Sequence, residues 1–127
     1  MKSKLFGFLL NKDIQLDIIN KRLVRYRAEN SENAMSFKVV TLTESQLRLL
    51  LLLLDNEIGE VTSKNDIIMH IWEGNPPYPS DQRLWYLIKV LRNKLTSLGI
   101  PEGVISNAHG VGYCIDIEDY SPIYFDK

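Results

Sequence analysis

The stretch SDQRLWYLIKVLRNKLTSLG, residues 80–99, and the stretch VISNAHGVGYCI, residues 104–115, decide the fold of this chain. The first predicts an amphipathic helix over residues 81–98, because its apolar residues recur every three or four positions. The second predicts two short strands that turn at His109 and Gly110, where glycine supplies the positive φ of a tight hairpin turn. Together they predict a basic helix with a flexible hairpin beside it.

The residues before this unit predict a sheet and two more helices. Turn signals separate β-rich segments at 5–10, 14–18, 22–26 and 38–42. Such short connections imply antiparallel pairing, since parallel strands need long crossovers. Thr43 and Gln46 have the spacing of a capping box at the start of a helix, and the six leucines 49–54 indicate that this helix is buried. Ser63 caps a second helix, which ends before the proline-rich loop of residues 73–79.

This order of elements predicts an α+β fold, a winged helix-turn-helix. It has an N-terminal antiparallel four-stranded sheet, three helices and a C-terminal β-hairpin wing over residues 104–117. The chain has 127 residues, enough for one such domain. We expect residues 1–117 to form the winged-helix domain. Residues 118–127 form an acidic and aromatic tail or linker, which could also pack on the domain.

The charge of the chain is unevenly distributed. Its formal net charge of -1 says nothing about nucleic acid. The predicted third helix, however, carries four cations against one acid, whereas residues 116–127 carry four acids against one lysine. No apolar run approaches the ~20 residues that a membrane-spanning helix needs, and the single cysteine allows no internal disulfide, which fits a reducing compartment. We therefore expect a cytoplasmic protein with a basic interaction surface.

No pattern in the sequence indicates catalysis. His70, His109 and Cys114 are scattered without the spacing of metal ligands. No serine or cysteine stands in a nucleophile elbow, and the glycines of the hairpin are not followed by the helix and lysine of a nucleotide-binding loop. We therefore expect a protein that is not an enzyme and that holds neither a cofactor nor a metal.

The predicted third helix divides into a core face and an outward face. The core face consists of Leu84, Leu87, Ile88, Leu91, Leu95 and Leu98. The outward face mixes cations with polar and apolar residues, the combination that reads DNA. Arginine and lysine bond to guanine, asparagine bonds to adenine, apolar atoms contact the thymine methyl, and cations neutralise phosphates. Polar residues near the hairpin tip could reach a phosphate or a minor groove. The candidate DNA-binding residues are therefore Arg83, Tyr86, Lys89, Val90, Arg92, Asn93, Lys94, Asn107 and His109.

Four stretches together resemble the OmpR/PhoB-type winged-helix effector domain of bacterial transcription regulators, especially its ToxR/CadC-like branch. They are LTESQLRLLLLLL, VTSKNDIIMHIW, SDQRLWYLIKVLRNKL and HGVGY, and the resemblance covers roughly residues 5–117. It implies a sequence-specific regulator of promoter DNA, often bound as a head-to-tail pair. Residues 81–98 would lie in the major groove and residues 104–117 on the adjacent minor groove or backbone. The loop of residues 73–79 would contact RNA polymerase.

Three positions depart from the pattern of that family. Val90, His109 and Cys114 stand where its members commonly carry arginine, which implies weaker DNA binding or more reliance on apolar contacts and partners. We expect no phosphoacceptor domain before the sheet, and a ToxR-like regulator would carry its membrane anchor after residue 127 if this chain is a fragment. Two alternatives remain open from the residues: an ordinary solvated helix surface, and a winged helix that binds only protein.

Overall fold

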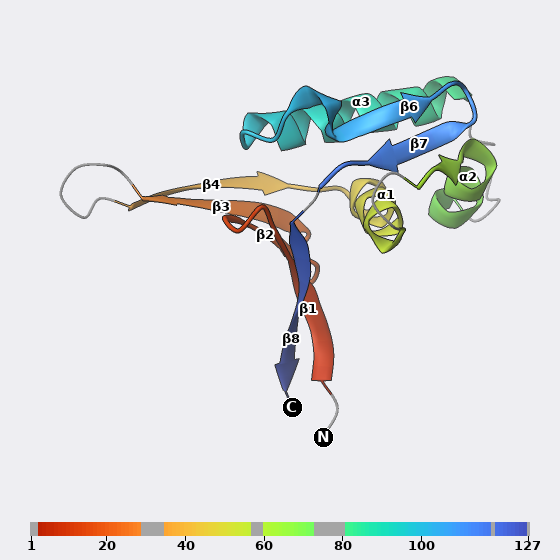
Figure 1. Ribbon diagram of the computed structural model, residues 1–127. Coiled ribbons are helices and arrows are strands. Elements are labelled where there is room, and N and C mark those ends of the chain that lie inside the picture. The colour runs from red at the N-terminus through yellow and green to blue at the C-terminus, as the bar shows by residue number, and fades with distance from the viewer. Residues whose placement is uncertain (1–2, 29–34, 57–59, 73–80, 118, 127) are drawn as a thin grey trace. The chain divides into compact units, whose positions relative to one another are not determined.

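The chain folds into two compact units (Figure 1), a sheet unit of Met1–Leu42 with Ile117–Lys127 and a helical unit of Thr43–Asp116. The computed structural model describes residues 3–28, 35–56, 60–72, 81–117 and 119–126. None of the helices in these ranges is long and apolar enough to cross a membrane.

The sheet unit is a single antiparallel sheet with the strand order β4-β3-β2-β1-β8. Its strands are β1 (Ser3–Leu10), β2 (Ile14–Asp17), β3 (Arg22–Ala28), β4 (Met35–Thr41) and β8 (Tyr120–Asp126). Side chains of a strand alternate between the two faces. Leu10, Ile14, Leu16 and Leu23 are all buried, and they form the apolar side of the sheet.

The predicted N-terminal sheet is confirmed, but it has five strands and not four. The fifth, β8, consists of residues that we expected to form a tail or linker. It pairs antiparallel with β1 from Ser3 opposite Asp126 to Leu10 opposite Tyr120. An edge-to-face contact joins the rings of Phe6 and Phe125, whose centroids lie 6.1 Å apart. Strand β8 forms an edge of the sheet. Its Pro122 is tolerated there, because an edge strand has one side without ladder hydrogen bonds.

A buried carboxylate fixes the turn between β2 and β3. The Asp17 residue is 3% exposed. Its oxygens accept hydrogen bonds from the Asn20 backbone N–H (3.1 Å), from Asn20 Nδ2 (2.8 Å) and from Arg22 Nε (3.2 Å). Burial alone would raise the pKa of Asp17, but these hydrogen bonds and the Arg22 charge together lower it below its ordinary value.

This lowered pKa predicts an acid-sensitive contribution to stability. An unfolded aspartate titrates at about pH 4, so Asp17 contributes fully above that pH, and its contribution is lost as the pH falls through the lower pKa of the folded state. We expect Asp17→Asn to lower the melting temperature at neutral pH, and the difference from the wild type to shrink at about pH 3. Thermal denaturation at both pH values tests this. A difference that does not change with pH would contradict it.

The helical unit contains the three predicted helices and the predicted wing. The helices are α1 (Glu44–Asp55), α2 (Lys64–Trp72) and α3 (Asp81–Ser97). A three-stranded sheet follows the order β5-β7-β6 and is made of β5 (Thr62–Ser63), β6 (Ile105–Ala108) and β7 (Gly112–Ile115). Val104 was expected in the wing, but it ends a short 3-10 helix, η1 (Glu102–Val104), that leads into β6.

Local signals explain where α1 and α2 begin. The predicted capping box is present: the Gln46 N–H donates to Thr43 Oγ1 (3.2 Å), and the Thr43 N–H donates to Gln46 Oε1 (2.9 Å). The Asp66 N–H donates to Ser63 Oγ (3.1 Å) at the start of α2. The leucine run is less uniform than predicted. Leu49, Leu50, Leu53 and Leu54 are buried, but Leu51 and Leu52 are only half-buried.

The wing turns at the predicted residues. His109 and Gly110 have φ values of 53° and 78°, and the Gly110 N–H donates to Asn107 Oδ1 (3.0 Å). Histidine is one of the non-glycine residues that adopt positive φ more readily. Gly112 has no positive φ, so the conformation of the turn, which requires glycine at position 110, does not explain the glycine at position 112. Gly112 is buried against the backbone of Thr62 in β5, where a side chain has no room.

Candidate nucleic-acid interface

The core face of α3 holds this helix in the helical unit. Leu84, Ile88, Leu91 and Leu95 are each no more than 1% exposed, as the helical periodicity predicted. Leu87 was also expected in the core, but it is half-buried and faces a hollow. The core therefore directs the opposite side of α3 outward.

A row of four exposed residues runs along the outward side of α3. Its members are Gln82, Tyr86, Lys89 and Asn93. Their spacings of four, three and four positions put them on one face of an α-helix. Tyr86 is 63% exposed. We call these residues the outward row. Three of them were predicted from the sequence. Gln82 was missed, although it stands four positions before Tyr86.

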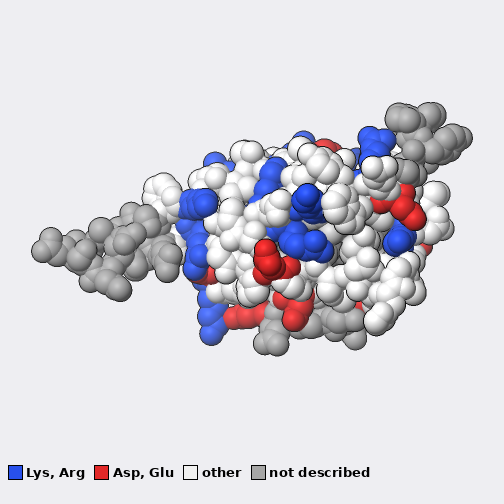
Figure 2. Space-filling view, turned by 90° about the horizontal axis from the view of Figure 1, so that it is seen from above, with Lys and Arg blue, Asp and Glu red and all other residues white. Residues whose placement is uncertain are grey.

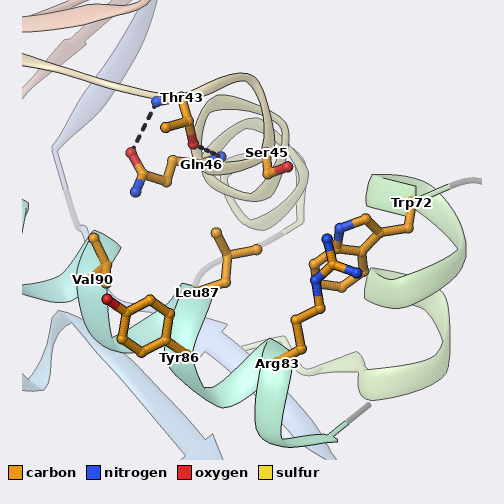
Figure 3. Close-up of a pocket in the computed structure, with 8 residues that line it drawn as sticks. All are labelled: Thr43, Ser45, Gln46, Trp72, Arg83, Tyr86, Leu87 and Val90. Atoms are coloured by element: carbon orange, nitrogen blue, oxygen red, sulfur yellow. Dashed lines mark hydrogen bonds between the residues drawn. The ribbon is translucent and has the colours of Figure 1, made fainter. Parts of the chain in front are cut away.

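Two cations of α3 lie over tryptophan rings: Arg83, which is beside the outward row, and Lys89, which belongs to it. The Arg83 guanidinium lies 5.1 Å from the centroid of the Trp72 ring at the end of α2, as Figure 3 illustrates. The Lys89 ammonium lies 5.1 Å from the centroid of the Trp85 ring, one turn earlier in α3. Contacts of this kind contribute about 0.5–1 kcal/mol at exposed sites. They restrict the positions of both charges while leaving both side chains exposed.

Two other predicted cations bond inside the helical unit. Arg92 donates from Nε (3.1 Å) and from Nη2 (2.7 Å) to the Ile105 carbonyl, at the first residue of β6. Lys94 Nζ donates to Gln46 Oε1 (2.6 Å), and burial lowers the pKa of this lysine. Arg92 therefore ties the wing to α3, and Lys94 ties α3 to the start of α1.

A hollow of about 490 Å³ opens between the start of α1, the end of α2 and α3 (Figure 3). It is lined by Thr43, Ser45, Gln46, Trp72, Arg83, Tyr86, Leu87 and Val90. Val90 is half-buried there and lies at the margin of the outward face, not at its centre. Its methyl groups can still be reached from outside, because the hollow is open.

The wing supplies the remaining candidates. Asn107 and His109 are both exposed, and Asn107 also accepts the hydrogen bond that closes the turn. Val111 at the tip is 63% exposed and was not predicted as a site residue. Tyr113 is buried, and its burial raises the pKa of its hydroxyl. Cys114 is half-buried, and its Sγ lies 3.1 Å from Ser106 Oγ.

Charges of both signs occur on the surface seen in Figure 2. Blue Lys and Arg side chains alternate there with red Asp and Glu side chains and a large uncharged area. The described residues contain no cluster of three His, Cys, Asp or Glu side chains that could hold a metal ion. The loop of residues 73–79, expected to contact RNA polymerase, lies outside the described residues.

Comparisons with known proteins agree on the type of domain. The family model described as "Transcriptional regulatory protein, C terminal" matches residues 37–115, which is more than half of the chain. This range includes all three helices and the wing. No curated protein sequence matches the chain.

Three solved structures show a similar fold. The DNA-binding domain of the Escherichia coli protein CadC has a TM-score of 0.70 and 15% identity, over 96% of this chain and 100% of that chain. The DNA-binding domain of response regulator AdeR, solved in complex with an intercistronic region, has a TM-score of 0.62 and 22% identity, over 84% of this chain and 97% of that chain. The DNA-binding domain of RstA from Klebsiella pneumoniae has a TM-score of 0.55 and 17% identity, over 100% of this chain and 97% of that chain. The predicted winged-helix fold is thereby confirmed.

Proposed function

The chain belongs to the family of C-terminal domains of transcriptional regulatory proteins, and on this premise we propose that it binds duplex DNA sequence-specifically through α3 and the wing. Helix α3 lies in the major groove, and the wing contacts the adjacent minor groove or backbone. The outward row carries this proposal. Tyr86, Lys89 and Asn93 are exposed side by side, and none of their side chains forms a hydrogen bond with another described residue.

The residues have different roles in this proposal. Lys89 and Arg83 supply positive charge to phosphates or guanine, and Asn93 bonds to adenine. Tyr86 and Val90 contact thymine methyl groups. Asn107 and His109 contact the backbone or minor groove from the wing. Arg92 and Lys94 add positive charge near the DNA while their hydrogen bonds hold the scaffold.

The family is one of regulatory domains and not of enzymes. We extend the proposal to the partners that the family resemblance implies. These are RNA polymerase at the loop of residues 73–79 and a second copy of the chain bound head-to-tail on DNA. The site of action is the cytoplasm, where bacterial DNA lies.

The salt dependence of binding tests this function. We expect wild-type affinity for a footprinted genomic duplex to fall steeply as salt rises, because bound cations displace counterions from phosphates. Lys89→Ala is expected to weaken binding about tenfold and, if Lys89 contacts a phosphate, to reduce the slope of log affinity against log salt by about one. Fluorescence anisotropy at several salt concentrations measures both quantities.

A matched control uses another exposed lysine. Lys12 lies in the turn between β1 and β2, and its side chain is 85% exposed. We expect Lys12→Ala to bind like the wild type. Wild-type binding that is absent, or that does not respond to salt, would instead favour the alternative of a winged helix that binds only protein.

A further inference from the structure

The outward row has a length that can be compared with DNA. Gln82 and Asn93 are separated by eleven positions, which corresponds to about 16 Å along an α-helix at ~1.5 Å per residue. Base pairs follow one another at about 3.4 Å, so a row aligned with the DNA axis spans about five base-pair steps. Lys89 divides this span unequally, about three steps from Gln82 and about two from Asn93.

Gln82 has the position and exposure of a residue that contacts DNA bases. It is the second residue of α3, and the N-terminal residues of a recognition helix are those that contact base edges in helix-turn-helix proteins. Its amide is exposed and has no hydrogen-bond partner among the described residues. It borders a shallow hollow of about 350 Å³ lined by Gln82, Arg83, Trp85 and Tyr86.

Glutamine offers one donor and one acceptor on the same amide, which match N7 and the N6 amino group of adenine. Asparagine at the other end of the row has the same pair of groups, whereas lysine donates to guanine. The row therefore has adenine-reading side chains at its two ends and a guanine-reading lysine between them.

We propose that Gln82 is a specificity-determining residue that selects adenine at one end of the target. Asn93 selects adenine at the other end, and Lys89 faces a guanine between them. The resulting order is adenine, guanine about three base pairs further, and adenine about two base pairs beyond that. The bases can lie on either strand. This inference rests on the proposed function.

Selection of bound duplexes from a random-sequence library tests the inference. We expect the wild type to enrich a motif with adenine at both ends. Gln82→Ala is expected to lose the preference at one end column only and to bind the wild-type motif about tenfold more weakly, as for one lost bidentate contact. Gln82→Arg is expected to change that column from adenine to guanine, because arginine bonds to guanine O6 and N7. Asn93→Ala should lose the preference at the opposite end.

Controls separate this inference from the proposed function. Ser121→Ala alters an exposed serine of β8 and should leave every column unchanged. Alanine is favourable in an exposed helix, so Gln82→Ala should keep the fold, which circular dichroism checks. A wild-type motif that stays the same in every column with both Gln82 variants would overturn the inference while DNA binding stands. No motif from the wild type itself would overturn the proposed function and the inference with it.

Discussion

Replacing Arg92 by alanine is expected to weaken binding to duplex DNA by about 10- to 100-fold. Arg92 directs two N–H groups at the Ile105 carbonyl, where β6 begins. Hydrogen bonds from a charged group contribute about 1.5–3 kcal/mol, and this bond joins α3, the helix that we propose reads bases, to the first strand of the wing. Without it, the wing loses its fixed position beside α3, and one positive charge is lost as well.

Arg92→Lys distinguishes the two losses. Lysine keeps the charge but lacks the planar fork that reaches one carbonyl with two donors. If Arg92 acts by positioning the wing, Arg92→Lys should bind almost as weakly as Arg92→Ala. If Arg92 mainly neutralises a phosphate, Arg92→Lys should retain most of the affinity.

The measurement combines affinity with the location of the contacts. Anisotropy titration gives the affinity. Hydroxyl-radical footprinting gives the protection of the minor groove, where we expect protection to be lost in Arg92→Ala while major-groove contacts persist at saturating protein. Arg83→Ala is a matched control, because it removes one positive charge of α3 that lies over Trp72 at the end of α2; its affinity should fall while the protection by the wing stays. Wild-type protection by the wing in Arg92→Ala would contradict the positioning role.

Most of the fold could be predicted because its signals are local. The Thr43 capping box, the Ser63 cap and the turn at His109 and Gly110 depend on residues within a few positions of one another. Strand β8 was missed for the opposite reason. Its partner β1 lies more than a hundred residues away in the chain, and neither strand carries a local sign of the pairing. The periodicity of α1 likewise did not reveal that Leu51 and Leu52 are half-buried, because burial depends on neighbours in space.

The sequence predicted which side of α3 faces outward, but not which side chains of that helix form hydrogen bonds within the helical unit. Helical periodicity identified the outward side of α3, since the angle between residues is fixed. Periodicity gives the direction of a Cβ atom and not the reach of the side chain beyond it. Arg92 and Lys94 have long stems that bring their charged ends back to Ile105 and Gln46. Gln82 was overlooked, although it lies about one helical turn before Tyr86 and therefore on the same side of α3.

Gly112→Ala is expected to destabilise the fold by about 3 kcal/mol. A Cβ atom at this position would collide with the backbone carbonyl of Thr62. The collision cannot be relieved by a rotamer change, because both groups belong to the β5–β7 pair, which joins Thr62 to Tyr113 and Ser63 to Gly112. Overpacking costs about 1–3 kcal/mol where a core can adjust, and paired backbone adjusts less than side chains do.

Thermal denaturation measures this loss, and Gly103→Ala is the matched control. A Cβ atom on Gly103 would meet no atom within 4 Å, and Gly103 has no positive φ, so the melting temperature should stay near that of the wild type. For Gly112→Ala we expect a decrease of about 10 °C. A decrease equal to that of Gly103→Ala would show that the close approach at Thr62 is unimportant. The expected damage extends beyond the wing, because the Ser63 that pairs with Gly112 also caps α2. One added methyl group should therefore loosen the wing and the start of α2 together.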